Sequence, residues 1–74
     1  MATINDYKKD ITQLKRVLTQ LINVGLKKDR DIEEIKNFCY DEINGAVSLY
    51  PEDIRQEAID ILRNHVELKI KKQK

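Results

Sequence analysis

The stretch INDYKKDITQLKRVLTQLINV, residues 4–24, carries an apolar residue at every third or fourth position. The members of this row step by 3, 4, 3, 4 and 3 residues: Ile4, Tyr7, Ile11, Leu14, Leu18 and Leu21. Such spacing aligns side chains along one face of an α-helix and is typical of a helix that packs lengthwise on another. The stretch therefore predicts a first helix over residues 4–24 and an all-α fold.

Residues at both ends of this stretch suit helix termini. Thr3, with Asp6 three residues later, matches an acidic variant of the capping box. Gly25 is expected to take the left-handed conformation that ends a helix, with Leu26 folding back on Leu21. Three more apolar residues widen the apolar arc beyond what one neighbouring helix would cover: Val17, Ile22 and Val24.

A second helix is predicted over residues 30–45, because acidic residues precede a new apolar row and Asp29 or Asp31 can cap its start. The apolar row of this helix is Ile32, Ile35, Phe38, Cys39 and Ile43. Gly45 is a stop signal, but the apolar face continues beyond it. The predicted end therefore lies anywhere from residue 44 to residue 49.

A third helix is predicted over residues 51–70, since Pro51 loses no hydrogen bond at a first helical position and pushes Tyr50 away from helical angles. Its apolar residues form two adjacent stripes: Ile54, Ala58, Ile61, His65 and Leu68 in one, and Ile59, Leu62, Val66 and Ile70 in the other. An arc of this width predicts a helix that touches two neighbours. The basic tail, residues 69–74, places cations at the negative end of the helix dipole.

These segments predict a single domain over residues 1–74, folded as an all-α, three-helix antiparallel bundle that runs up, down, up. A chain of 74 residues buries only about 60% of the surface that its unfolded form exposes. The wide apolar faces of the first and third helices therefore predict a homodimer or a protein partner that covers the remainder.

The inventory of reactive residues argues against catalysis. Two glycines are too few for a dinucleotide-binding turn or a phosphate-binding loop. One cysteine and one histidine cannot form a structural zinc site or a disulfide within one chain. Ser48, Cys39 and His65 are the sole members of their types, so a catalytic triad would need all three to converge. We expect no enzymatic activity, cofactor, metal or small-molecule substrate.

The net charge of +1 hides a strong segregation of charge along the chain. Residues 1–28 carry six cations and two anions, residues 29–60 three and ten, and residues 61–74 five and one. Four acids are predicted to lie opposite the apolar face of the third helix: Asp53, Glu57, Asp60 and Glu67. Such a stripe is either an ordinary solvated face or a docking surface that steers a basic protein, with Tyr40 and Tyr50 as aromatic anchors.

The sequence therefore favours a small, non-enzymatic protein–protein interaction module that docks through charged helix faces. Candidate classes are a regulator, an inhibitor, an immunity- or antitoxin-type factor, and a phage or plasmid accessory protein. The alternative is a nucleic-acid-binding accessory protein that contacts phosphates through six cations: Lys8, Lys9, Lys15, Arg16, Lys71 and Lys72. This alternative is the weaker, because both later helices open with acids that repel phosphate.

The expected location is the cytoplasm. The sequence holds neither a signal-peptide pattern nor an apolar run of membrane-spanning length, and its single thiol suits a reducing compartment. Lysine and isoleucine occur ten times each, a usage that points to an AT-rich bacterial or phage genome.

Overall fold

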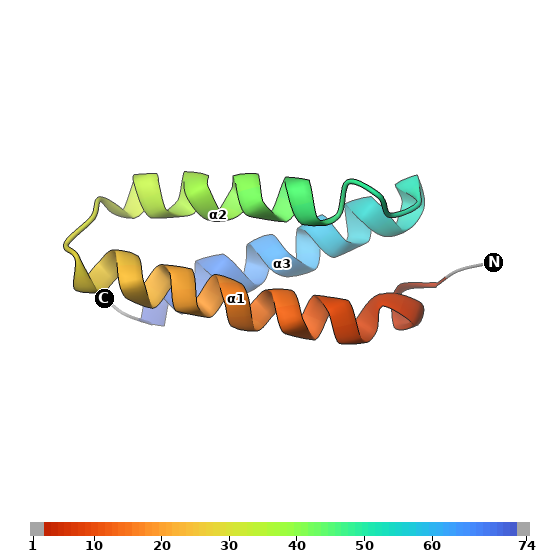
Figure 1. Ribbon diagram of the computed structural model, residues 1–74, viewed down its shortest axis with the longest axis horizontal. Helices are drawn as coiled ribbons and strands as arrows, with labels where there is room; N and C mark the ends of the chain where they lie inside the picture. The colour runs from red at the N-terminus through yellow and green to blue at the C-terminus, as the bar shows by residue number, and fades with distance from the viewer. Residues whose placement is uncertain (1–2, 73–74) are drawn as a thin grey trace.

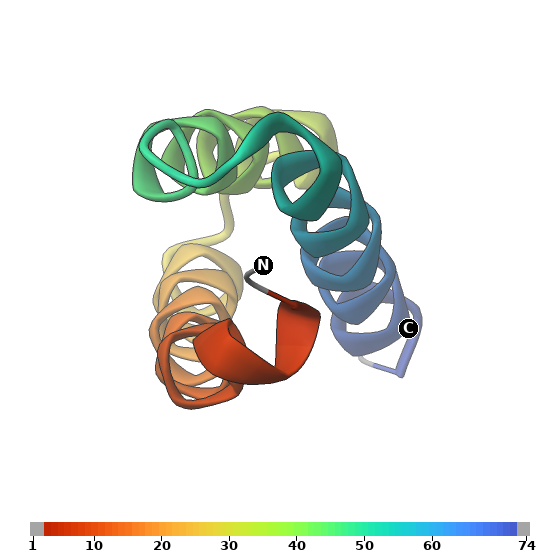
Figure 2. The same cartoon turned by 90° about the vertical axis from the view of Figure 1, so that its right-hand side faces the viewer.

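The computed structural model describes residues 3–72 and confirms the three-helix antiparallel bundle (Figure 1). A short 3-10 turn, η1 (Ile4–Tyr7), leads into α1 (Lys8–Lys27), which is followed by α2 (Ile32–Ala46) and α3 (Glu52–Lys72). Every pair of helices is in contact, and the end-on view in Figure 2 places the three at the corners of a triangle. Residues 73 and 74 of the predicted basic tail lie outside the described residues.

The core is a column of apolar side chains that all three helices supply. In α3 the buried positions step by four residues: Ile54, Ala58, Leu62, Val66 and Ile70. A row with this step is inclined to the helix axis, so α3 crosses behind the other two helices at an angle, as Figure 1 shows. Its upper end packs near the end of α2 and its lower end near the end of α1. None of the helices within residues 3–72 has the length and apolar character needed to cross a membrane.

The observed caps agree with the sequence at the starts of η1 and α2, although the first four residues of the predicted first helix form the 3-10 turn η1. The Asp6 carboxylate accepts a hydrogen bond from the Thr3 backbone N–H at 2.7 Å. Asp31 is the N-cap of α2, and its carboxylate accepts from the Glu33 backbone N–H at 3.3 Å. α2 ends at Ala46, inside the predicted range, whereas α3 continues to Lys72, two residues beyond its predicted end at residue 70.

The prediction that Gly25 ends the first helix in a left-handed conformation is wrong. α1 continues to Lys27, and Asp29, with φ of 57°, is the residue that reverses the chain. Gly25 is buried inside the helix against α2, where an added Cβ would lie 2.8 Å from Ile35 Cγ1. The absence of a side chain at Gly25 therefore allows α1 and α2 to approach closely, rather than allowing a left-handed backbone conformation at a helix end.

Three apolar residues lie on a different part of their helix surface from the one that the sequence predicts. Ile22, predicted to flank the main row, is among the most deeply buried side chains, at 1% exposed. Phe38 and Leu68, predicted to lie in apolar faces, are 54% and 61% exposed. Successive residues of a helix are separated by 100°, so a neighbour of a core position can lie on the rim of the packed face.

Candidate functional site

The side of the bundle between α1 and α3 is joined by a polar contact. His65 Nε2 lies 2.9 Å from Thr19 Oγ1 and 3.1 Å from the Lys15 carbonyl oxygen. The Thr19 hydroxyl donates to the same carbonyl at 2.9 Å, so both neighbours of Nε2 present acceptors and Nε2 carries the proton. Burial lowers the pKa of His65, partly offset by its hydrogen bond to the Lys15 carbonyl.

The side between α2 and α3 is joined by a second polar contact. The Tyr40 hydroxyl donates to Glu67 Oε1 at 3.2 Å, and the Arg63 guanidinium lies 4.8 Å from the centroid of the Tyr40 ring. Burial raises the pKa of Tyr40, and donation to the Glu67 carboxylate raises it further. Tyr40 and Glu67, both predicted to bind a partner, are therefore already engaged with each other within the chain.

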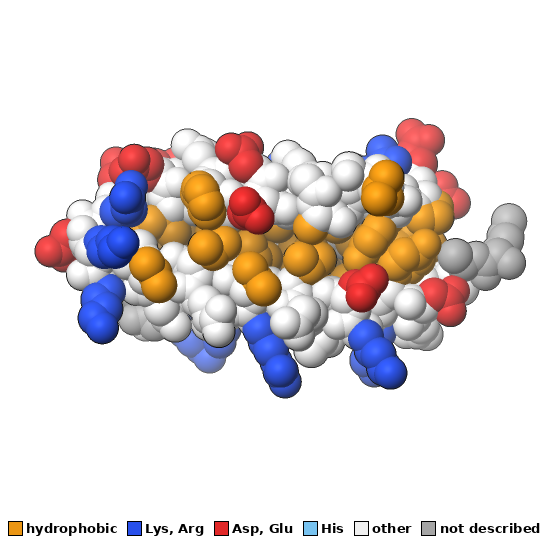
Figure 3. All heavy atoms as spheres, viewed as in Figure 1, with side chains coloured by type: hydrophobic (Ala, Val, Ile, Leu, Met, Phe, Trp, Pro, Cys, Tyr) orange, Lys and Arg blue, Asp and Glu red, His pale blue; other side chains and the backbone are white. Residues whose placement is uncertain are grey.

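The side between α1 and α2 differs from the other two. Within residues 3–72, no side-chain hydrogen bond or ion pair joins α1 to α2. Figure 3 shows a band of apolar side chains along the line where the two helices meet. We call this band the groove surface, and its members are Leu14, Val17, Leu21, Val24, Ile35 and Phe38.

The groove surface is apolar and partly exposed: Leu14 and Leu21 are half-buried, and Ile35 is buried at its base. Val17, Val24 and Phe38 are 37%, 51% and 54% exposed. A hollow of about 280 Å³ opens beside Gly25, and Lys28, Arg30 and Glu34 line it together with apolar residues. Arg30 and Glu34 form an exposed ion pair of 3.8 Å at this end of the groove. The arrangement offers apolar contact area with charged groups at the rim, which is the usual anatomy of a protein interface.

The predicted acidic stripe lies on α3, and its members Asp53, Glu57, Asp60 and Glu67 are all exposed. Glu67 is at the edge of the stripe next to α2, where it accepts the hydrogen bond from Tyr40. Asp60 accepts a hydrogen bond from Gln56 Nε2 at 3.3 Å, one helical turn away. Tyr50, predicted as an aromatic anchor, is only 8% exposed, and its ring packs on Tyr7 with centroids 4.3 Å apart. We therefore leave Tyr50 out of the docking surface, because its side chain belongs to the core.

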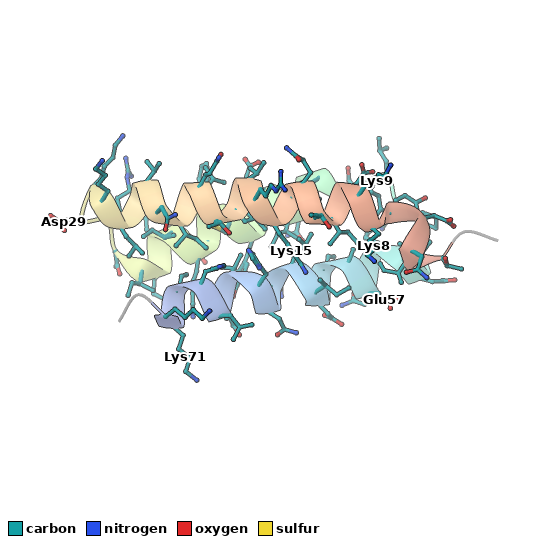
Figure 4. The ribbon with its side chains drawn as sticks, turned by 90° about the horizontal axis from the view of Figure 1, so that it is seen from below. Lys8, Lys9, Lys15, Asp29, Glu57 and Lys71 are labelled. Carbon is teal, nitrogen blue, oxygen red and sulfur yellow. The ribbon has the colours of Figure 1, made fainter. Side chains whose placement is uncertain are left out.

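The six candidate phosphate contacts do not gather into one patch. Figure 4 shows Lys8 and Lys15 on the side of α1 that faces α3, with Glu57 opposite Lys8. Lys9 points to the other side of α1, and Lys71 lies on α3 at the far end of a molecule 43 Å long. Arg16 is exposed on α1, and Lys72 is the last residue of α3. The structure therefore gives these cations no common surface that would follow a nucleic-acid backbone.

The three residue types that could supply nucleophilic chemistry have separate environments. The Ser48 hydroxyl donates to the Gly45 carbonyl oxygen in the turn after α2. Cys39 is fully buried, and this burial raises the pKa of its thiol. The negative charge of the nearby Glu42 raises it further. His65 contacts only α1 through its ring nitrogen, as described above. In the part of the chain from residue 3 to residue 72, no group of three or more His, Cys, Asp or Glu side chains is arranged to hold a metal ion.

The groove surface was not identified from the sequence, although a signal for it exists. The helix α1 also carries a second row, which shares Leu14 and Leu21 with the main apolar row and steps by 4, 3, 4, 3 and 4 residues: Asp10, Leu14, Val17, Leu21, Val24 and Lys28. We call this the groove-side row of α1. Only the excess apolar width of the helix was recognised, not the direction in which this row would point.

Comparison with family models, with curated proteins and with solved structures finds no match for this chain.

Proposed function

We propose that this chain is a small, non-enzymatic protein–protein interaction module that docks a protein partner on its groove surface. The observation that carries the proposal is the exposure of Val17, Val24 and Phe38 on the side between α1 and α2, where no side-chain hydrogen bond or ion pair joins the helices within residues 3–72. Contiguous exposed apolar groups are costly in water and mark interaction sites in folded proteins. Phe38 has the chemistry of an anchor residue, because an aromatic ring brings a large contact area with few rotatable bonds.

The acidic stripe on α3 has a separate role in this proposal. Asp53, Glu57 and Asp60 face solvent, away from the groove surface, so they act at a distance. A field of one sign raises the rate at which a basic partner arrives while adding little to the affinity. A module with one apolar docking face and one charged face suits a small regulator or inhibitor, including an immunity-type, antitoxin-type or phage accessory protein.

Photo-crosslinking at matched positions tests the docking face. The reactive amino acid p-benzoylphenylalanine replaces Phe38 in one variant and Leu68 in a control, because these residues have similar exposure but lie on α2 and α3. Irradiation of each variant, purified and in extract of the host that encodes it, is followed by mass spectrometry of the adducts. We expect polypeptide adducts at position 38 and few at position 68. Equal labelling at both positions, or none at position 38, would refute the proposal.

A further inference from the structure

We infer that the partner on the groove surface is a second copy of this chain, bound so that α1 of one copy lies antiparallel to α1 of the other. The inference rests on the proposed function and names the partner of the same surface. It comes from the order of residues in the groove-side row of α1, whose central members are exposed or half-buried.

The groove-side row is symmetric in sequence about residue 19. Reading outward from that midpoint, Val17 pairs with Leu21, and Leu14 pairs with Val24. When two copies of α1 align antiparallel about a two-fold axis at this level, each pair meets across the interface. Both pairs then join a leucine to a valine, so a larger side chain faces a smaller one in each layer.

The charged residues at the two ends of the groove-side row favour the antiparallel alignment. Asp10 and Lys28 are equidistant from residue 19, so in the antiparallel dimer Asp10 of each copy faces Lys28 of the other. A parallel alignment would place Asp10 on Asp10 and Lys28 on Lys28, which is repulsive at both ends. Within residues 3–72, neither Asp10 nor Lys28 forms an ion pair inside the chain. Their charges are therefore available to a second copy.

The position of α2 also fits this axis. An added Cβ on Gly25 would lie 2.8 Å from Ile35 Cγ1, so these two residues are level with each other. Because α1 and α2 are antiparallel, residue 19 of α1 is then level with about residue 41 of α2. Phe38 of each copy then lies over the other copy near Gly45, where a Cβ would meet nothing within 4 Å. Glu42 lies close to the axis, and its carboxylate faces its own symmetry mate there. Glu42 therefore weakens the dimer, and this unfavourable contact gives the arrangement a specific signature.

A charge exchange tests the arrangement in the purified protein. Sedimentation equilibrium from about 1 to 200 μM covers the range in which modest interfaces dissociate. We expect the wild-type chain to dimerise. Asp10→Lys alone and Lys28→Asp alone each weaken the dimer about tenfold, because each creates two like-charge contacts per dimer. The double exchange restores the dissociation constant to within about threefold of wild type.

Two further variants separate this geometry from a general effect of charge. Lys9→Asp changes the same helix by the same charge on its outer side, and we expect no more than about a twofold change. Glu42→Gln removes the repulsion at the axis and is expected to tighten the dimer about threefold or more. Helical circular dichroism and the thermal melt of each variant verify that the bundle remains folded.

A wild-type chain that stays monomeric throughout this range overturns the inference. Two results overturn the antiparallel register. One is a double-exchange variant whose dimer is weaker than that of either single variant. The other is a Glu42→Gln variant that dimerises no more tightly than the wild-type chain. Failure of the dimer and failure of the proposed function are distinguishable. A monomer that still gives adducts at position 38 with another protein loses the dimer but keeps the docking face.

Discussion

The side between α1 and α2 contrasts with the two sides that α3 closes. On the α3 sides, Thr19 meets His65, and Tyr40 meets Glu67 and Arg63. On the third side, no side-chain hydrogen bond or ion pair within residues 3–72 joins α1 to α2, and apart from Glu42 the centre is apolar and partly exposed. All three sides bury core residues, so the difference in polar contacts does not simply reflect how much each side contributes to stability.

Polar contacts at a helix interface fix its geometry, because a donor and an acceptor tolerate little displacement. The two α3 sides are therefore fixed internally, whereas the third side keeps apolar groups that a folded monomer leaves in water. Binding of a partner would explain why these apolar groups are exposed, because it would remove them from water. Substitutions on the three sides should therefore have different effects.

Aspartate substitution should distinguish the core from the groove surface. Leu62→Asp buries a charge in a position that is fully inaccessible, and we expect it to unfold the domain, a loss of about 4 kcal/mol or more. Phe38→Asp should keep the monomer fold, with a change of less than about 1 kcal/mol, since the ring is half exposed. Urea titration followed by circular dichroism measures both. A Phe38→Asp chain that unfolds would place Phe38 in the core and remove the contrast.

The two glycines provide a matched pair on the same side. In Gly25→Ala, better helix propensity is outweighed by the clash with Ile35, and we expect a net destabilisation of about 1 kcal/mol. Gly45→Ala meets no neighbour and should stabilise the domain by about 0.5 kcal/mol. The midpoints of chemical unfolding report both changes. Stabilisation by both substitutions would mean that α1 and α2 are not held at close approach.

Acidification should reduce the stability of the domain through His65 on the α1–α3 side. The pKa of His65 is lower in the folded chain than its ordinary value of 6.5, so the unfolded chain binds the proton more readily. Stability therefore falls as the pH drops through about 6.5 and levels off below the folded pKa. Thermal melts from about pH 7 to pH 5 should show this loss in the wild type and a flatter profile in His65→Gln. Parallel profiles for the two chains would contradict the assignment.

Charge reversal on the outer face of α3 should have the smallest effect. Asp60→Lys removes only an exposed hydrogen bond from Gln56, so we expect the free energy of unfolding to change by less than about 0.5 kcal/mol. The dimerisation constant should also stay unchanged, because α3 lies away from the groove surface. A large shift in sedimentation would instead place the acidic stripe in the interface between copies.

The fold follows from the sequence because apolar spacing and caps are local properties. The row from Ile4 to Leu21, the acids before α2 and the proline before α3 each specify one helix, and three amphipathic helices with short loops leave few arrangements. The sequence does not separate the two possible roles of Gly25, because a glycine that ends a helix and a glycine that admits a neighbouring helix both simply lack a side chain. Only the position of Ile35 distinguishes these two roles.

The candidate site was less predictable because it depends on how each helix is rotated about its axis. The wide apolar arc of α1 indicated a second neighbour, but not whether that neighbour belongs to the same chain. The acidic stripe could be read from periodicity within α3, whereas the contact between Tyr40 and Glu67 joins residues 27 positions apart. Phe38 follows the apolar pattern of α2 and is nevertheless 54% exposed, because Ile35, Cys39 and Ile43 are the residues of α2 that turn into the core.

Dilution of the isotopically labelled protein, followed by amide and methyl nuclear magnetic resonance, tests the central claim most directly. If two copies meet on the groove surface, signals of Val17, Val24 and Phe38 shift with concentration, while those of Asp60 and His65 stay fixed. Shifts confined to the outer face of α3, or spectra that do not change with concentration, would contradict the antiparallel dimer on the groove surface.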